Sequence, residues 1–134
     1  MSLLIAKYTM LVTVASVVLV LVLTARVGML RGRTGVAAPA TSGHPDFERA
    51  YRIHLNTVEQ LVLFLPVLWL SVPVVGDLWT GVLGALWLAG RIVYVLSYTR
   101  DPATRGAGMM ITLGVTTALA LIALAGAIRL FMLP

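Results

Sequence analysis

Four long uncharged stretches dominate this chain of 134 residues. They cover residues 8–25, 61–76, 78–90 and 106–128 and consist mainly of apolar residues. Only 11% of the chain is charged, whereas a water-soluble domain usually carries about a quarter. An apolar helix of about 20 residues crosses the hydrocarbon core of a bilayer. The sequence therefore predicts an all-α integral membrane protein, an up-down bundle of four transmembrane helices in a single domain that covers residues 1–134.

Two of the stretches are too short to cross a bilayer without their polar flanks. Residues 61–76 and 78–90 number 16 and 13, so each helix must extend into the neighbouring polar sequence. We expect helices at about 3–30, 46–74, 77–99 and 102–132, with a loop rich in Gly, Pro, Ser and Thr at 31–45. Tight turns at 75–77 and 99–101 make the neighbouring helices antiparallel.

The basic residues are distributed unevenly between the two ends of this predicted bundle. The first and third connections with their flanks carry six arginines: Arg26, Arg31, Arg33, Arg49, Arg100 and Arg105. The other end has little beyond Lys7 and Arg129, so the positive-inside rule predicts cytoplasmic loops 1 and 3, with both termini on the opposite side. This distribution explains the net charge of +5 without a nucleic-acid partner. The absence of cysteine excludes disulfides, thiolate metal sites and a cysteine nucleophile, and no metal is expected.

Two of the expected helices each present one polar stripe. The stripes consist of Arg49, Arg52, Asn56 and Glu59 on the second helix, and Arg91, Tyr94 and Tyr98 on the third. Spacings of three and four residues place the members of each stripe on one helix face. The extension of both short helices draws the inner members of these stripes below the membrane surface.

Positive charge exceeds negative charge in this polar cluster. A charged side chain at membrane depth costs several kcal/mol unless it is paired. Ion pairs between Glu59 and Arg52 or Arg91 would explain part of the set, but Glu59 is the only acid. Arg91, Arg52 and Arg105 outnumber it, so we expect an anion from outside the chain, either a lipid headgroup or a small polyanionic ligand. Glutathione fits this description, as do other amino-acid-like anions.

The same residues form two spaced motifs that resemble those of a known family. Residues 47–59 read F-E-R-x-x-R-x-x-x-N-x-x-E, and residues 91–105 read R-x-x-Y-x-x-x-Y-x-R-x-x-x-x-R. Both resemble, without gaps, signatures of the MAPEG superfamily, the membrane-associated proteins of eicosanoid and glutathione metabolism. The resemblance extends over essentially the whole chain. It implies a homotrimer in which glutathione, as co-substrate, lies between neighbouring subunits near the cytoplasmic face.

The resemblance also implies roles for individual residues. The residues expected to hold glutathione are Arg31, Arg52, His54, Asn56, Glu59, Arg91, Tyr94 and Tyr98. His54 is equally well explained as a surface residue near a helix end. Arg105 is the expected catalytic residue, because a cation beside a thiol lowers the thiol pKa from its usual value of about 8.5 and favours the thiolate. The N-terminal dipole of the fourth helix acts in the same direction.

One position departs from the pattern of the leukotriene-synthase branch, whose first helix ends in two adjacent arginines. Here the segment reads Arg31-Gly32-Arg33, so Arg31 takes the first role and Gly32 leaves the second empty. Arg33 is the residue that could substitute for the second arginine. This departure argues against leukotriene synthesis as the specific reaction.

The sequence thus predicts a membrane-bound glutathione transferase that conjugates the glutathione thiolate to hydrophobic electrophiles, with lipid-hydroperoxide peroxidase activity as an extension. One alternative is a non-enzymatic lipid-binding scaffold, like the lipoxygenase-activating member of the superfamily. Another is a small multidrug or ion transporter. Arg105 favours the enzyme over the scaffold. Surplus arginines near Glu59 argue against proton-coupled transport, because they would depress the carboxylate pKa below the range needed for proton uptake.

Overall fold

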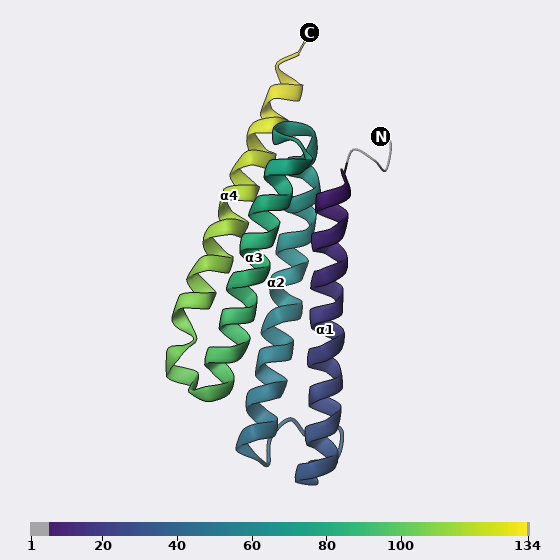
Figure 1. Cartoon of the computed structure of the whole chain (residues 1–134), viewed down its shortest axis with the longest axis vertical. Coiled ribbons are helices and arrows are strands. Elements are labelled where there is room, and N and C mark those ends of the chain that lie inside the picture. Colours follow the sequence, from purple (N-terminus) through teal and green to yellow (C-terminus); the bar gives the residue numbers. More distant parts are fainter. Residues whose placement is uncertain (1–5, 134) are drawn as a thin grey trace.

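The computed structural model describes residues 6–133. Its four α-helices are α1 (Lys7–Thr34), α2 (Pro45–Val75), α3 (Asp77–Arg100) and α4 (Gly106–Phe131), with a short 3-10 helix, η2 (Pro102–Thr104), before α4. The helices lie side by side and alternate in direction (Figure 1). All four are long and apolar enough to cross a membrane. The predicted up-down bundle of a multi-pass integral membrane protein is therefore confirmed.

The two ends of the bundle differ in their connections. The α1–α2 loop and the α3–α4 turn lie together at one end, and the α2–α3 turn lies at the other (Figure 1). We call the first the arginine-rich end. The arginines of its loops and helix ends are Arg31, Arg33, Arg49, Arg100 and Arg105.

Two helix boundaries differ from the sequence expectation. α1 continues to Thr34 and the loop starts at Gly35, because the helix ends only where Gly35 adopts the left-handed conformation, with a φ of 71°. The expected start near residue 3 lies outside the described residues. α4 begins at Gly106 instead of 102, because Pro102–Thr104 form a 3-10 turn. The Asp101 carboxylate caps that turn by accepting a hydrogen bond from the backbone N–H of Ala103.

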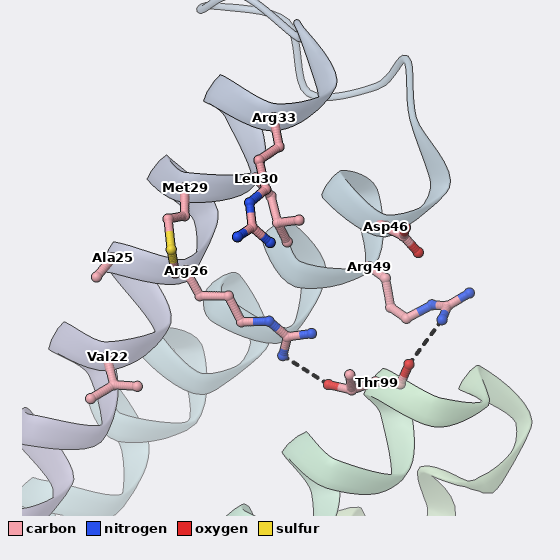
Figure 2. A pocket seen from close by; sticks show the side chains of 9 residues that line it. All are labelled: Val22, Ala25, Arg26, Met29, Leu30, Arg33, Asp46, Arg49 and Thr99. Atoms are coloured by element: carbon pink, nitrogen blue, oxygen red, sulfur yellow. Dashed lines mark hydrogen bonds between the residues drawn. The ribbon is translucent and has the colours of Figure 1, made fainter.

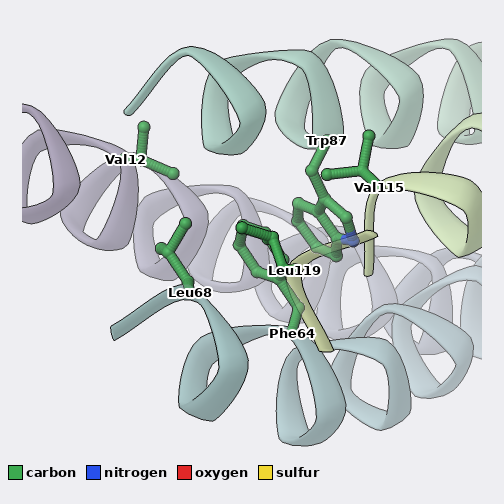
Figure 3. Close-up of a cluster of buried hydrophobic side chains, with 6 residues drawn as sticks. All are labelled: Val12, Phe64, Leu68, Trp87, Val115 and Leu119. Atoms are coloured by element: carbon green, nitrogen blue, oxygen red, sulfur yellow. The ribbon is translucent and has the colours of Figure 1, made fainter. Parts of the chain in front are cut away.

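A hydrophobic core joins all four helices (Figure 3). Its buried members are Val12 of α1, Phe64 and Leu68 of α2, Trp87 of α3, and Val115 and Leu119 of α4. The rings of Phe64 and Trp87 are stacked, with centroids 4.0 Å apart and an interplanar angle of 7°. Large apolar side chains on the outer faces of every helix are exposed, which suits contact with lipid.

Two contacts fix neighbouring helices against each other. At the start of α1, where Ala6 offers no side-chain cap, the Asp77 carboxylate of α3 accepts hydrogen bonds from the backbone N–H groups of Tyr8 and Thr9. At the arginine-rich end, Gly108 of α4 lies against the backbone of α3 at Tyr94, where a Cβ atom would overlap. The missing side chain lets the first turns of α4 approach α3 closely.

Candidate functional site

Arg91 is the most deeply placed member of the predicted polar cluster, with 1% of its surface exposed. Its Nε donates a hydrogen bond to Thr57 Oγ1 across 3.0 Å, which joins α3 to α2. Its guanidinium carbon lies 4.0 Å from the centroid of the Tyr94 ring, a cation–π contact. Its Nη2 is buried and has no hydrogen-bond partner within residues 6–133. A buried donor without a partner is costly, so this face of Arg91 is suited to an acceptor from outside the chain.

Asn56, Tyr94 and Tyr98 continue this cluster toward the arginine-rich end. Asn56 Nδ2 donates to Tyr94 Oη across 2.6 Å. Both tyrosines are buried, and their ring centroids are 5.6 Å apart with an interplanar angle of 58°. Together with Arg91, these residues form the network that we call the Arg91 network: Asn56, Thr57, Arg91, Tyr94 and Tyr98. The structure thus joins Asn56 of α2 to Tyr94 of α3, and Tyr94 in turn contacts Arg91 and Tyr98.

Arg105 lies at the N-terminus of α4, next to the Arg91 network. Its guanidinium carbon is 5.2 Å from the centroid of the Tyr98 ring, and the side chain is exposed. Its carbonyl oxygen accepts the hydrogen bond of Met109 N–H, in the first turn of the helix. A group that approached Tyr98 from outside would therefore meet both a guanidinium and the positive end of a helix dipole.

Arg52 and Glu59 belong to α2 and are both exposed in the single chain. Arg52 precedes Asn56 by four residues, which places it on the same face of the helix, one turn nearer the arginine-rich end. The ion-pair explanation of the sequence required Glu59 to bind Arg52 or Arg91. The described side-chain hydrogen bond of Arg91 goes instead to the neutral hydroxyl of Thr57 and does not use Glu59.

Two other predicted residues bond elsewhere in the chain. Arg31 Nη1 donates to the carbonyl oxygens of Val36 and Ala40 over 3.1 and 2.8 Å, and its guanidinium packs on the Phe47 ring. It therefore orders the α1–α2 loop. His54 Nε2 shares a hydrogen bond of 3.1 Å with Thr24 Oγ1 and links α2 to α1. The structure does not join either residue to the Arg91 network by a hydrogen bond within residues 6–133.

A cavity of about 610 Å³ lies at the arginine-rich end, between α1 and the ends of α2 and α3 (Figure 2). Arg26 Nη1 donates to Thr99 Oγ1 over 2.8 Å, and Arg49 Nη1 donates to the Thr99 carbonyl oxygen over 2.9 Å. None of the residues predicted to bind glutathione lines this cavity. Arg49 was expected in the same stripe as Arg52, but its side chain binds the end of α3.

The sequence reasoning missed Thr57 and Gly108, although Thr57 lies inside the second-helix motif. Its only signal was a hydroxyl residue two positions before Glu59. The role of Thr57 depends on how α2 is rotated against α3, and the spacing of residues within one helix does not determine that rotation. Gly108 is one of several small residues in the third and fourth helices, and only its contact with the Tyr94 backbone shows its role.

Comparison with known proteins identifies the family. The MAPEG family model matches residues 9–125, which span most of α1 through most of α4 and include every predicted site residue. The chain belongs to the MAPEG family.

Relatives within the MAPEG family differ in what their names state. Human microsomal glutathione S-transferase 2 is 33% identical over 103 residues, which cover 77% of this chain and 68% of the relative. An uncharacterized protein of Synechocystis sp. is 44% identical over 98 residues, 73% of this chain and 72% of its own length. Leukotriene C4 synthase of Bos taurus is 34% identical over 70 residues, 52% of this chain and 47% of that enzyme. Glutathione transfer and leukotriene synthesis are thus both represented among the relatives of this MAPEG protein.

Proposed function

We propose that this MAPEG protein is a membrane-bound glutathione transferase that joins the glutathione thiolate to hydrophobic electrophiles. The observation that carries the proposal is the buried Nη2 of Arg91, which has no acceptor within residues 6–133. Exposed Arg52 lies on α2 and exposed Arg105 is the N-cap residue of α4, with Glu59 as the acid of the set. Three cations and one carboxylate match a ligand with several acidic groups and one ammonium group.

Each residue has a distinct part in this proposal. Arg52 and Arg91 bind carboxylate or carbonyl oxygens of the tripeptide, and Glu59 accepts hydrogen bonds from its ammonium group. Asn56 holds the Tyr94 hydroxyl and offers its amide oxygen to the peptide. Arg105 lies over the Tyr98 ring and stabilises the thiolate. In the reaction the thiol proton leaves to solvent, and the sulfur forms a bond to an electrophilic carbon whose leaving group departs with the bonding electron pair.

We also propose that further copies of the chain complete the site, as a homotrimer with the arginine-rich end in the cytoplasm. Arg52 and Glu59 are exposed on a transmembrane helix, where direct contact with lipid would be costly. A neighbouring subunit would cover both and exclude water from the bound tripeptide. A covered site also strengthens the attraction between the guanidinium groups and the thiolate.

The first test concerns the thiolate. Purified protein is titrated with glutathione, and thiolate formation is followed by ultraviolet absorbance while binding is measured separately by calorimetry. Arg105→Ala should keep glutathione binding and lose the thiolate absorbance. Arg100→Ala is the matched control, because Arg100 is an exposed arginine at the same end of the bundle. Thiolate absorbance that persists in Arg105→Ala would refute the catalytic role of Arg105.

The second test concerns the ammonium group. Glu59→Gln removes the negative charge and keeps the shape of the side chain. Glutathione should then bind at least about tenfold more weakly, because the variant loses a charge-assisted hydrogen bond worth ~1.5–3 kcal/mol. Glu48→Gln is the control, since Glu48 is exposed and its bond to Gly43 N–H needs only an acceptor oxygen. Equal affinity of Glu59→Gln and the parent protein would contradict the pairing. Binding without thiolate in the parent protein would favour the non-enzymatic scaffold.

A further inference from the structure

The cavity of about 610 Å³ at the arginine-rich end is a second cationic site (Figure 2). It is lined by three arginines, one aspartate, one threonine and four apolar residues of α1: Arg26, Arg33, Arg49, Asp46, Thr99, Val22, Ala25, Met29 and Leu30. None of these residues belongs to the proposed glutathione site. The positive charge around the cavity therefore needs an explanation of its own.

Two of the three arginines are held in place by the end of α3. Figure 2 shows Arg26 and Arg49 converging on Thr99, which accepts one hydrogen bond from each through its hydroxyl and its carbonyl oxygen. Each guanidinium has five N–H donors, so each keeps donors that can face a ligand. Arg33 follows Arg26 by seven residues, two turns along the same face of α1. Thr99 is neutral, so it fixes these groups without balancing their charge.

The apolar part of the lining belongs to α1, the helix that also carries Arg26 and Arg33, and it continues into the outer surface of that helix. Val22 and Met29 line the cavity and are each 59% exposed. Val18, one turn further into the membrane, is also exposed. An occupant that satisfies both parts of the lining must carry an anionic group beside the arginines and a hydrocarbon chain along the exposed apolar residues of α1. Basic pockets between transmembrane helices bind phospholipid headgroups on this pattern.

We propose that this cavity binds an anionic phospholipid of the adjacent leaflet. Its phosphate lies among Arg26, Arg33 and Arg49, and one acyl chain follows Val22 and Met29 along α1. A zwitterionic lipid would bring an ammonium group toward the same arginines and is disfavoured by repulsion. The bound lipid connects α1 and α2 to the end of α3, and its binding is independent of glutathione.

The test measures lipid retention on the purified protein in detergent by native mass spectrometry. Phosphatidylglycerol, phosphatidylcholine and inorganic phosphate are added in separate titrations. We expect the protein to retain phosphatidylglycerol in preference to phosphatidylcholine. Arg33→Gln should bind phosphatidylglycerol about fivefold more weakly, because each basic residue near an anionic lipid contributes ~1 kcal/mol. The double variant Arg26→Gln/Arg33→Gln should lose about 25-fold on the same basis.

Controls separate this site from general surface charge and from misfolding. Arg33 is exposed in the last turn of α1, so Arg33→Gln should fold normally even if the Arg26 variant does not. Arg100→Gln removes the same charge at the same end, outside the cavity, and should leave retention unchanged. Equal retention of the two lipids, equal loss in Arg100→Gln, or displacement of the lipid by inorganic phosphate at matched concentration would overturn the proposal.

Discussion

The bond between Thr57 and Arg91 gives the sharpest test of how the buried network is stabilised. Thr57→Val replaces the hydroxyl by a methyl group of nearly the same size. The change leaves Arg91 Nε without its acceptor in a place where the arginine is 1% exposed. Nη2 of the same guanidinium already has no partner within residues 6–133. The variant would therefore bury a cation that keeps its contact with the Tyr94 ring but has lost the acceptor of its Nε.

Two reference values bound the expected loss of stability. Hydrogen bonds between transmembrane helices contribute ~0.6 kcal/mol on average and at most ~1.7 kcal/mol. Hydrogen bonds to charged groups contribute ~1.5–3 kcal/mol, and removal of one partner adds the cost of the stranded donor. Since the donor here is a buried cation, we expect the free energy of unfolding to fall by about 2 kcal/mol. Thr57→Ser keeps the acceptor and loses one methyl group, which costs about 0.8 kcal/mol.

The measurement is reversible unfolding in mixed detergent micelles, followed by tryptophan fluorescence, since Trp87 lies in the core. A double-mutant cycle with Arg91→Met isolates the pair, because Thr57→Val should cost little once the cation is absent. We expect a coupling free energy of about 1.5 kcal/mol. If Thr57→Val were no less stable than Thr57→Ser, or if the cycle gave no coupling, the hydrogen bond would not hold Arg91 in place.

Two further substitutions test contacts that set the geometry of the bundle. Asp77→Ala removes the cap that α3 provides to α1 and should lower the unfolding free energy by ~1–2 kcal/mol. Asp77→Asn keeps an acceptor oxygen and should lower it less. Thermal unfolding of the two variants measures this difference. Gly108→Ala places a Cβ against the Tyr94 backbone and should cost ~1–3 kcal/mol, while Gly114→Ala, on an open face of the same helix, should be neutral or stabilising. Equal stability of the two alanine variants would show that α4 does not need close contact with α3.

The number and spans of the helices followed from the sequence because bilayer thickness restricts both. Two apolar stretches shorter than the bilayer had to extend into polar sequence, and α2 and α3 do so. The end of α1 was wrong because Arg31, Gly32 and Arg33 read as loop residues. The helix tolerates one internal glycine, and the signal that ends it is the backbone conformation of Gly35, which the sequence does not display.

The candidate site was predictable where residues share one helix and less so where they meet across helices. Spacing alone placed Arg91, Tyr94 and Tyr98 on one face of α3, and these residues contact each other. The partner of Arg91 depends on the rotation of α2 against α3, and Thr57 was missed for that reason. Arg49 reaches the end of α3, a position that the spacing within α2 does not determine.

The structure changes how the surplus of arginine should be understood. The arginines in the arginine-rich half of the bundle include more than Arg52, Arg91 and Arg105, the three for which the sequence predicted an external anion. Several of them donate to neutral oxygens: Arg26 to Thr99, Arg31 to Val36 and Ala40, Arg49 to Thr99, and Arg91 to Thr57. A neutral acceptor fixes the direction of a guanidinium but leaves its charge unbalanced, so such bonds hold cations in position for a ligand. The cations then divide between two places, each with three arginines and one carboxylate. The proposed glutathione site has Arg52, Arg91, Arg105 and Glu59, and the cavity has Arg26, Arg33, Arg49 and Asp46. Because the two sets share no residue, the two proposed ligands, glutathione and an anionic phospholipid, would not compete for the same arginines.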